Sequence, residues 1–170
     1  MRLIGPFFLC ASIGLLIWAH YFSSTPSASQ EAAGQAIHFT KGDPPIVGAP
    51  IQQKAHPLLL VNLFASWCTP CITELPYLKT LREQSGIPLI GIAYHDKTQN
   101  VIDWLHQHGN PFDAVYLDER GALLGTLTVR GVPETMILNA QGQVVFRHSG
   151  VVTEPEVAEF LQQLKALQPE

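Results

Sequence analysis

Two cysteines, Cys68 and Cys71, have the type and spacing best suited to chemistry in this chain. They follow an apolar run, Leu58–Phe64, and Pro70 suits the first turn of a helix that begins beside them. Backbone N–H groups at a helix start stabilise a thiolate, so Cys68 is predicted to be a nucleophile at neutral pH. Cys71, one turn inside the helix, is placed to attack a mixed disulfide formed on Cys68. The pair is therefore predicted to be a redox-active disulfide.

A structural zinc site and an inert disulfide are the two alternative interpretations of this pair. Zinc needs four ligands, and the sequence offers no second Cys-x-x-Cys and no finger-type spacing between cysteine and histidine. A disulfide that closes so short a loop adds little stability, so stapling alone does not explain the pair. The third cysteine, Cys10, lies in an apolar segment and is expected to be a small hydrophobic residue. We therefore expect no metal and no cofactor, and favour redox chemistry.

The composition limits the class of protein that carries this pair. The chain has 170 residues, enough for one domain of ordinary size. Hydrophobic residues reach 46%, as in globular proteins, and charged residues only 14%. The net charge is −4 and the 10 basic residues are scattered, whereas nucleic-acid binding needs a clustered basic face. Nucleic acid is therefore not expected as a partner.

The amino terminus is apolar, unlike the rest of the chain. A helix from Leu3 to Phe22 would span roughly 30 Å, the thickness of a bilayer core. We expect an uncleaved transmembrane anchor, and a signal peptide cleaved after Ser27-Ala28-Ser29 is the alternative. Under both interpretations the rest of the chain is exported, because Arg2 is the only Lys or Arg residue before Lys41. The expected division is an anchor, a flexible linker and a single domain, at residues 1–22, 23–35 and 36–170.

The exported part alternates between apolar runs typical of strands and the spacing of amphipathic helices. Leu58–Phe64 has no polar alternation, which indicates a central strand buried on both faces. Further expected elements are a helix from Cys68, a strand at Pro88–Ala93, a helix at Thr98–His108, a strand at Ala114–Leu117, a hairpin of Thr135–Leu138 with Val144–Arg147, and a last helix capped by Thr153. We predict an α/β fold with a mixed central sheet and flanking helices.

The motif around the cysteines resembles that of the thioredoxin superfamily. The matching residues are Trp67–Cys71, Pro76 and the dipeptide Val132-Pro133. The resemblance implies a thioredoxin-like fold in which Pro133 follows a cis peptide bond and lies beside the cysteines. It also implies that the backbone at Val132 and Pro133 pairs with the extended chain of a substrate. We expect Trp67 to pack over the active-site turn and to shield the disulfide, and Trp104 to belong to the core.

Within this superfamily the chain is similar to the membrane-anchored DsbE/CcmG branch of thiol-disulfide interchange proteins. The similarity covers roughly residues 57–164 and rests on Asn62–Cys68, Glu74, Tyr94–Asp96, Trp104-Leu105, Gly109–Phe112 and Gly131–Thr135. It implies a reductant held in the bacterial inner membrane by a single span, with its catalytic domain in the periplasm. The implied substrate is the Cys-x-x-Cys-His segment of apocytochrome c before haem attachment.

Glu74 is a candidate catalytic residue. It lies three positions after Cys71 on the same helical face, while the neutral Asn62 stands at the strand position six residues before Cys68. A carboxylate near the second thiol accepts its proton when that thiol attacks. The alternative is a solvated carboxylate paired with a basic helix neighbour, either Lys79 or Arg82.

Glu134 is a candidate for substrate contact, either as a groove acid beside Pro133 or as an ordinary edge residue. In the first case it and Glu74 would receive the histidine of an extended Cys-x-x-Cys-His segment. The complete expected site has Cys68, Cys71 and Glu74 as catalytic residues and Trp67, Val132, Pro133 and Glu134 as substrate-binding residues.

The function predicted on these grounds is a periplasmic thiol-disulfide oxidoreductase that reduces apocytochrome c during cytochrome c maturation. Its expected partners are apocytochrome c or other disulfide-bearing exported proteins, a membrane thiol-disulfide electron donor, the cytochrome c maturation machinery and the membrane itself. A general exported reductant is one alternative. A non-catalytic copper or haem binder using the cysteine pair is another, although Met1 and Met136 are the only methionines and neither is near the pair in sequence.

Overall fold

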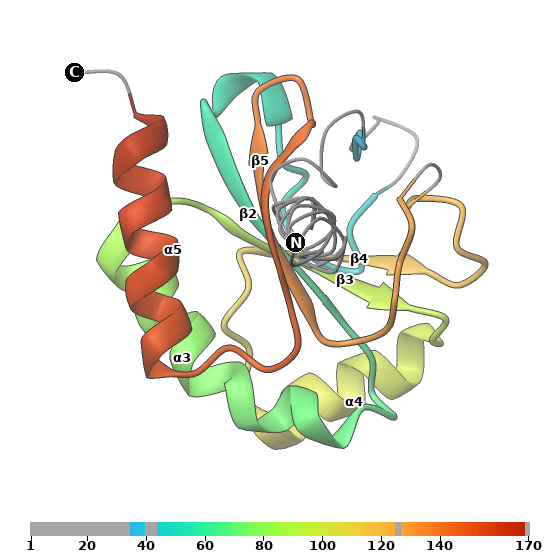
Figure 1. Cartoon of the computed structure of the whole chain (residues 1–170). Coiled ribbons are helices and arrows are strands. Elements are labelled where there is room, and N and C mark those ends of the chain that lie inside the picture. The colour runs from blue at the N-terminus through green and yellow to red at the C-terminus, as the bar shows by residue number, and fades with distance from the viewer. Residues whose placement is uncertain (1–34, 40–43, 125–126, 169–170) are drawn as a thin grey trace, which may run out of the picture.

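The apolar run Leu58–Phe64 forms the middle of a six-stranded mixed sheet (Figure 1). The structure is a computed structural model that describes residues 35–39, 44–124 and 127–168. The strands are β1 (Val47–Gly48), β2 (Leu58–Phe64), β3 (Leu89–Tyr94), β4 (Ala114–Asp118), β5 (Glu134–Asn139) and β6 (Val144–Ser149). Their order is β1-β4-β3-β2-β5-β6, with β2, β3 and β4 parallel and the others antiparallel to their neighbours. The predicted mixed sheet is confirmed.

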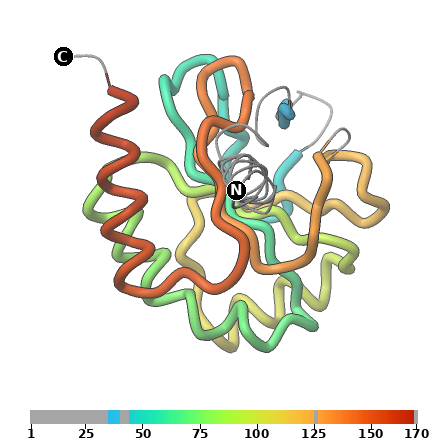
Figure 2. The backbone as a smooth tube through the Cα atoms, in the orientation of Figure 1, coloured from blue at the N-terminus to red at the C-terminus, as the bar shows by residue number. Residues whose placement is uncertain are grey.

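Three helices pack on one face of this sheet: α3 (Thr69–Ser85), α4 (Thr98–His108) and α5 (Glu154–Leu167). The parallel strands β2, β3 and β4 follow one another in one direction, so right-handed crossovers place α3 and α4 on the same face. α5 packs beside α3 (Figure 1). Figure 2 shows the chain passing from the β5–β6 hairpin directly into α5. The bounds predicted for β2 and α4 are confirmed.

The alternation of side chains along β2 divides the core into two layers. Leu60 and Phe64 pack against the helices, while Leu59 and Leu63 belong to the cluster on the opposite face. All seven residues of β2 are buried, as predicted for a strand with pairing partners on both sides and a core layer on each face. Asn62 shares the parity of Leu60 and therefore points toward the helices.

Among the described residues, the opposite face is covered by irregular segments. Ile37 is fully buried there, and the ring of Phe39 lies 4.7 Å from that of Tyr116. The backbone N–H of Ile51 donates to Tyr116 Oη (3.0 Å), and Gln53 Nε2 donates to the carbonyl of Ile37 (2.9 Å). The short strand β1 and the 3₁₀ helix η1 (Gln53–Ala55) lie in this part of the chain. Neither was predicted, because two or three residues carry no detectable periodicity.

The described chain joins the sheet one residue before the predicted domain boundary. The N–H of Val144 donates to the carbonyl of Gln35 (3.0 Å), and Ala36 forms a bridge with Gln143. The predicted anchor, residues 1–22, and the predicted linker up to residue 34 lie outside the described residues. Within the ranges that the structure does describe, no helix is both long and apolar enough to cross a membrane.

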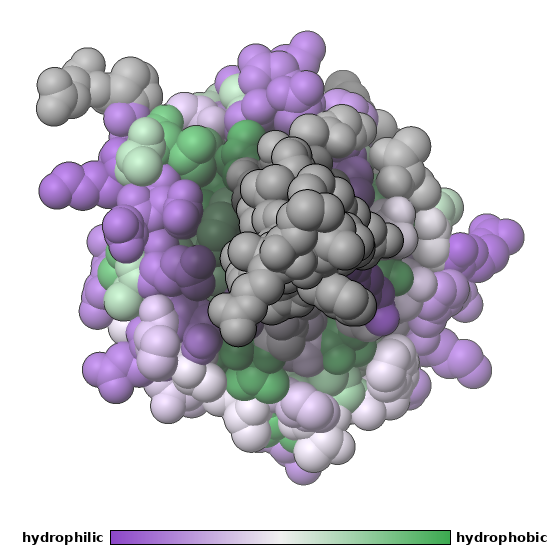
Figure 3. All heavy atoms as spheres, in the orientation of Figure 1, coloured by the Kyte–Doolittle hydropathy of each residue, from purple (hydrophilic) through white to green (hydrophobic). Residues whose placement is uncertain are grey.

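Few large hydrophobic side chains reach the described surface. On the face seen in Figure 3, hydrophilic side chains occupy most of the periphery and hydrophobic ones form small groups between them. The exposed large hydrophobic residues in the described ranges are Trp67, Tyr77 and Leu167. Trp67 is the most exposed of these, at 60%, and it directly precedes Cys68.

Gly91 on β3 lies under an aromatic cluster of the helix-covered layer. The Phe64 ring is 4.9 Å from that of Phe112 and 5.2 Å from that of Trp104, between centroids. A Cβ atom at position 91 would lie 2.9 Å from Phe64 Cε1 and 3.0 Å from the Phe112 ring, which is closer than packed carbon atoms approach. We expect Gly91→Ala to lower the free energy of unfolding by about 1–3 kcal/mol, measured by urea denaturation.

The double variant Gly91→Ala/Phe64→Leu is the control for this prediction. Removing the ring of Phe64 leaves room for the added methyl group, so the two substitutions together should cost less than the sum of their separate costs. Strict additivity would show that the contact with Phe64 is not the cause of the loss.

Candidate active site

Cys68 and Cys71 form a disulfide where β2 leads into α3, with Cα atoms 5.4 Å apart. Cys68 is the N-cap residue of α3, and its N–H donates to the carbonyl of Ala65 (3.1 Å) to close a turn after the strand. Pro70 occupies the first turn of the helix, as predicted. Cys68 is 4% exposed and Cys71 is completely buried. Cys68 is thus the less buried of the two thiols, while its role as nucleophile stays a prediction.

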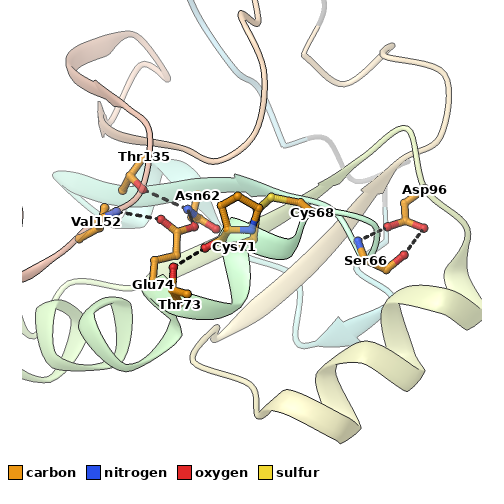
Figure 4. Close-up of a disulfide and its surroundings, with 10 residues drawn as sticks. Asn62, Ser66, Cys68, Cys71, Thr73, Glu74, Asp96, Thr135 and Val152 are labelled. Atoms are coloured by element: carbon orange, nitrogen blue, oxygen red, sulfur yellow. Dashed lines mark hydrogen bonds between the residues drawn. A yellow bond between two sulfur atoms is a disulfide. The ribbon is translucent and has the colours of Figure 1, made fainter.

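Glu74 is completely buried, and Figure 4 shows its side chain beside Asn62 and beside Val152 in the segment before α5. Asn62 Nδ2 donates to Glu74 Oε1 (2.9 Å), and the N–H of Val152 donates to Glu74 Oε2 (3.1 Å). The alternative of a solvated carboxylate paired with Lys79 or Arg82 is therefore wrong. These two cations pair elsewhere, Lys79 with Glu83 and Arg82 with Asp113.

Burial raises the pKa of Glu74 from its ordinary value of 4.5 to about 7, and the hydrogen bonds from Val152 and Asn62 partly oppose this rise. A carboxyl group with such a pKa exchanges its proton readily near neutral pH. Glu74 lies one helical turn after Cys71, and both side chains are buried. The pair therefore combines a thiol and a proton acceptor on one helical face.

Thr135 completes this buried polar group. In sequence it belonged to the matching segment Gly131–Thr135 but was assigned no role. Asn62 Nδ2 donates to Thr135 Oγ1 (3.0 Å) as well as to Glu74, so it links β5 to α3 through β2. Asn62 Oδ1 is buried and has no hydrogen-bond partner among the described residues. In sequence, Asn62 could be recognised only as a neutral residue in an apolar strand, and that polar interruption was the available signal.

The peptide bond between Val132 and Pro133 is cis, as the resemblance implied. Pro133 is buried directly before β5, and its carbonyl accepts a hydrogen bond from the N–H of Gly150 (2.9 Å). Val132 is partly buried and packs against both core layers. A substrate-pairing role of Val132 and Pro133 stays a prediction.

Glu134 is neither an exposed groove acid nor an edge residue. Neighbouring residues of a strand point to opposite faces, so Thr135 points toward α3 and Glu134 away from it. The carboxylate accepts hydrogen bonds from Arg147 Nη2 and Ser149 Oγ on β6, at 3.0 Å each. Its side chain is 1% exposed, and β5 lies between β2 and β6. Direct contact of this carboxylate with a substrate is therefore not supported.

Trp67 is largely in solvent, but its indole makes one hydrogen bond to the protein. Its Nε1 donates to the carbonyl of His95 (3.3 Å) at the end of β3. The expected shielding of the disulfide by this ring stays a prediction. Trp104 is 5% exposed and belongs to the core, as predicted.

Two further residues at this end of the sheet were not assigned a role from sequence. The carboxylate of Asp96 accepts hydrogen bonds from the N–H and the hydroxyl of Ser66, just before the cysteines (Figure 4). Asp96 follows β3 as the cysteines follow β2, and the carboxyl ends of parallel strands meet at one edge of a sheet. In the described ranges, no group of three or more His, Cys, Asp or Glu side chains is placed to hold a metal ion.

The raised pKa of Glu74 predicts a pH dependence of stability. In the unfolded chain Glu74 loses its proton near pH 4.5, whereas the folded protein keeps it up to about pH 7. Folding therefore becomes less favourable as the pH rises through this interval, by roughly 3 kcal/mol from this group. Glu74→Gln should remove that loss, so the variant gains stability relative to the parent between pH 4 and 8 in urea denaturation of the oxidised proteins.

Glu83→Gln is the matched control, because Glu83 lies on the exposed side of the same helix. Its stability should follow that of the parent across the same pH range. If the stability of Glu74→Gln also changes with pH as that of the parent does, this carboxyl group titrates normally.

Comparisons with known proteins agree with this geometry. The thiol:disulfide interchange protein DsbE of Pasteurella multocida is 43% identical over 103 residues, which are 61% of this chain and 56% of that protein. The thiol:disulfide interchange protein CycY of Rhizobium leguminosarum bv. viciae is 35% identical over 118 residues, or 69% and 62% of the two chains. The chain thus spans about half the length of the relatives that it matches.

Solved structures show the same fold. The crystal structure of a thiol:disulfide interchange protein of the thioredoxin family from Chlorobium tepidum TLS superposes with a TM-score of 0.60 at 23% identity, covering 79% of this chain and 96% of that one. The thioredoxin-like fold is therefore confirmed. The model of the Redoxin family matches residues 51–164, which include the disulfide, Glu74 and Pro133. Since the match extends over more than half of the chain and over all residues around the disulfide, the chain belongs to the Redoxin family.

Proposed function

We propose that this protein is a thiol-disulfide oxidoreductase that acts as a reductant through Cys68 and Cys71. The observation that carries the proposal is the disulfide at the start of α3 with the buried carboxyl group of Glu74 one turn further along. A disulfide with a purely structural role needs neither a position at a helix start nor a buried ionisable neighbour. The names of the relatives, thiol:disulfide interchange proteins, support the same reaction class.

The reaction begins with the reduced protein. The thiolate of Cys68 attacks one sulfur of a substrate disulfide, which forms a mixed disulfide and releases the other substrate sulfur as a thiolate. Cys71 then gives its proton to Glu74, and its thiolate attacks Cys68 Sγ. The second substrate sulfur leaves as a thiolate, and both substrate thiolates take protons. The substrate gains two electrons and the protein is left with the Cys68–Cys71 disulfide, which a thiol donor must reduce before the next cycle.

The narrower proposal concerns substrate and place. We infer that the substrate is the Cys-x-x-Cys-His disulfide of apocytochrome c, that the domain faces the periplasm and that a membrane protein supplies the electrons. The similarity to the DsbE/CcmG branch supports this, together with the apolar amino terminus. In an oxidising compartment a reductant must be selective, and the backbone at Val132 and Pro133 is the proposed edge for an extended segment.

A general exported reductant is the second candidate, and one observation favours it. The expected recognition of the substrate histidine depended on Glu74 and Glu134, but both carboxylates are buried and hydrogen-bonded within the protein. These two acids are therefore not accessible to the substrate histidine. Any selectivity must come from the backbone edge or from the exposed surface around Trp67.

Substrate trapping separates the two candidates. In Cys71→Ser the mixed disulfide on Cys68 cannot be released, so the variant should retain its substrate covalently in cells. Cys68→Ser is the control and should retain none, because it lacks the nucleophile. Mass spectrometry of the trapped material is expected to find apocytochrome c. A diverse set of exported proteins, with normal levels of holocytochrome c in cells lacking the protein, would establish the general reductant instead.

Glu74 should control the second half of the reaction. We expect Glu74→Gln to slow release of the substrate from the mixed disulfide by roughly tenfold or more, because general base catalysis is lost. The first attack by Cys68 should be little changed, and rapid-quench experiments with a disulfide peptide measure both steps. In the parent the release rate should rise with pH up to about 7, where Glu74 loses its proton.

Glu83→Gln again serves as the control and should leave both steps at parental rates. If Glu74→Gln and the parent release the substrate equally fast at every pH, Glu74 is not the base.

A further inference from the structure

The turn that leads from β2 into Cys68 is hydrogen-bonded to the residues that follow β3, the neighbouring strand of the sheet. This turn consists of Ala65, Ser66, Trp67 and Cys68 and is closed by the hydrogen bond from the N–H of Cys68 to the carbonyl of Ala65. Its two central residues form hydrogen bonds with two consecutive residues that directly follow β3. Ser66 binds to Asp96, and Trp67 binds to the carbonyl of His95.

The hydrogen bonds that Asp96 accepts from Ser66 are the strongest of those that hold this turn. The side chain of Asp96 is buried, at 4% exposure, and Oδ2 accepts the N–H of Ser66 at 2.6 Å. Oδ1 accepts the hydroxyl of Ser66 at 3.0 Å and the N–H of Lys97, just before α4, at 2.8 Å. Hydrogen bonds to a carboxylate are stronger than those between neutral groups. One buried carboxylate therefore joins the turn before the cysteines to the start of α4.

The backbone of His95 turns its carbonyl toward Trp67. His95 has a positive φ of 47°, the only such angle at a non-glycine residue in the described ranges. A left-handed conformation is costly for a residue with a side chain and persists only where its surroundings impose it. Here the N–H of His95 donates to the carbonyl of Asp118 (2.9 Å), and its own carbonyl accepts the indole N–H of Trp67.

The neighbouring strand offers a comparison within the same molecule. Asp118 ends β4 as Asp96 follows β3, is 2% exposed, and accepts the N–H groups of Leu123 (3.1 Å) and Leu124 (3.0 Å). Both acids thus cap a loop at the same edge of the sheet. The carboxylate of Asp118 holds its own loop, whereas that of Asp96 reaches across to the turn of the cysteines.

We propose that His95 and Asp96 form a positioning clamp, with Asp96 as the positioning residue that sets Trp67 beside Cys68 for contact with the substrate. The proposal rests on the function proposed above. Trp67 is 60% exposed, and the hydrogen bond from Nε1 to His95 favours one orientation of its ring at the surface. A side chain ordered before binding loses less conformational entropy when a partner binds. Asp96 does not touch the substrate and acts through Ser66 and Trp67.

A double-mutant cycle tests whether Asp96 acts through Trp67. The second-order rate constant for reaction of the reduced protein with a synthetic Cys-x-x-Cys-His disulfide peptide is measured for the parent, Asp96→Ala, Trp67→Phe and the double variant. We expect Asp96→Ala to lower this rate roughly tenfold in the parent but less than about twofold in the Trp67→Phe background, since coupled residues are not additive. Equal losses in both backgrounds, or no loss in either, would overturn the proposal.

The indole N–H resonance of Trp67 provides a readout that a general loss of stability does not move. This resonance, assigned by its disappearance in Trp67→Phe, should shift in Asp96→Ala and stay in place in Asp113→Ala. Asp113 is the control because its carboxylate also accepts a backbone N–H, that of Leu89 (2.9 Å), but at the opposite end of β3. Should Asp96→Ala fail to fold, Asp96→Asn keeps the shape and replaces one acceptor oxygen by a donor, and the same shift is expected. An unchanged resonance would overturn the clamp. A parent that exchanges no disulfide would instead contradict the proposed function, while the resonance still tests the clamp.

Discussion

The arrangement of this site depends on the hydrogen bonds of the buried carboxyl group of Glu74. It joins three distant parts of the chain: the central strand through Asn62, the cysteine helix on which it lies, and the approach to α5 through the N–H of Val152. Burying a carboxylate is costly unless hydrogen bonds satisfy it or a proton neutralises it. The protein supplies two hydrogen bonds, and the pKa rises to about 7, so the group stays ready to exchange a proton beside Cys71.

The alternation of side chains along the strands decides what each acid can do. Asn62 and Thr135 point to the helix-covered face and reach the cysteine helix, whereas Glu134, one residue before Thr135, points to the other face and pairs with Arg147. A shift of one residue in either strand would exchange these roles. Glu74 and Glu134 are similar in sequence context, since both lie near a proposed site residue, but the sheet separates them. Of these two acids, Glu74 is the one on the cysteine helix, where the proposed proton transfer takes place.

The parallel part of the sheet explains why the site lies where it does. Cys68 and Asp96 follow the parallel strands β2 and β3, and Asp118 is the last residue of β4. The carboxyl ends of these three strands share one edge of the sheet. A loop at this edge binds to its neighbours as well as to its own strand. The turn before Cys68 is thus fixed by the turn after β3, which is fixed in turn by the backbone at the end of β4.

Much of the architecture follows from the sequence by itself. The uninterrupted apolar run of β2, the spacing of α4 and the Pro and Cys residues at the start of α3 determine those elements locally, because burial and helix capping act over a few neighbouring residues. The cysteine pair and its chemistry are equally visible, since Cys-x-x-Cys lies within a single helical turn.

What only the tertiary structure decided is which polar groups meet. The burial of Glu74, its hydrogen bonds to Asn62 and Val152, and the position of Glu134 on the far face depend on strand register and on helices packed from distant parts of the chain. The irregular cover of the second face, with β1 and η1, depends in the same way on contacts such as that of Ile51 with Tyr116. A proton acceptor is thus recognisable from its residue type, but its pKa is set by neighbours that sequence spacing does not reveal.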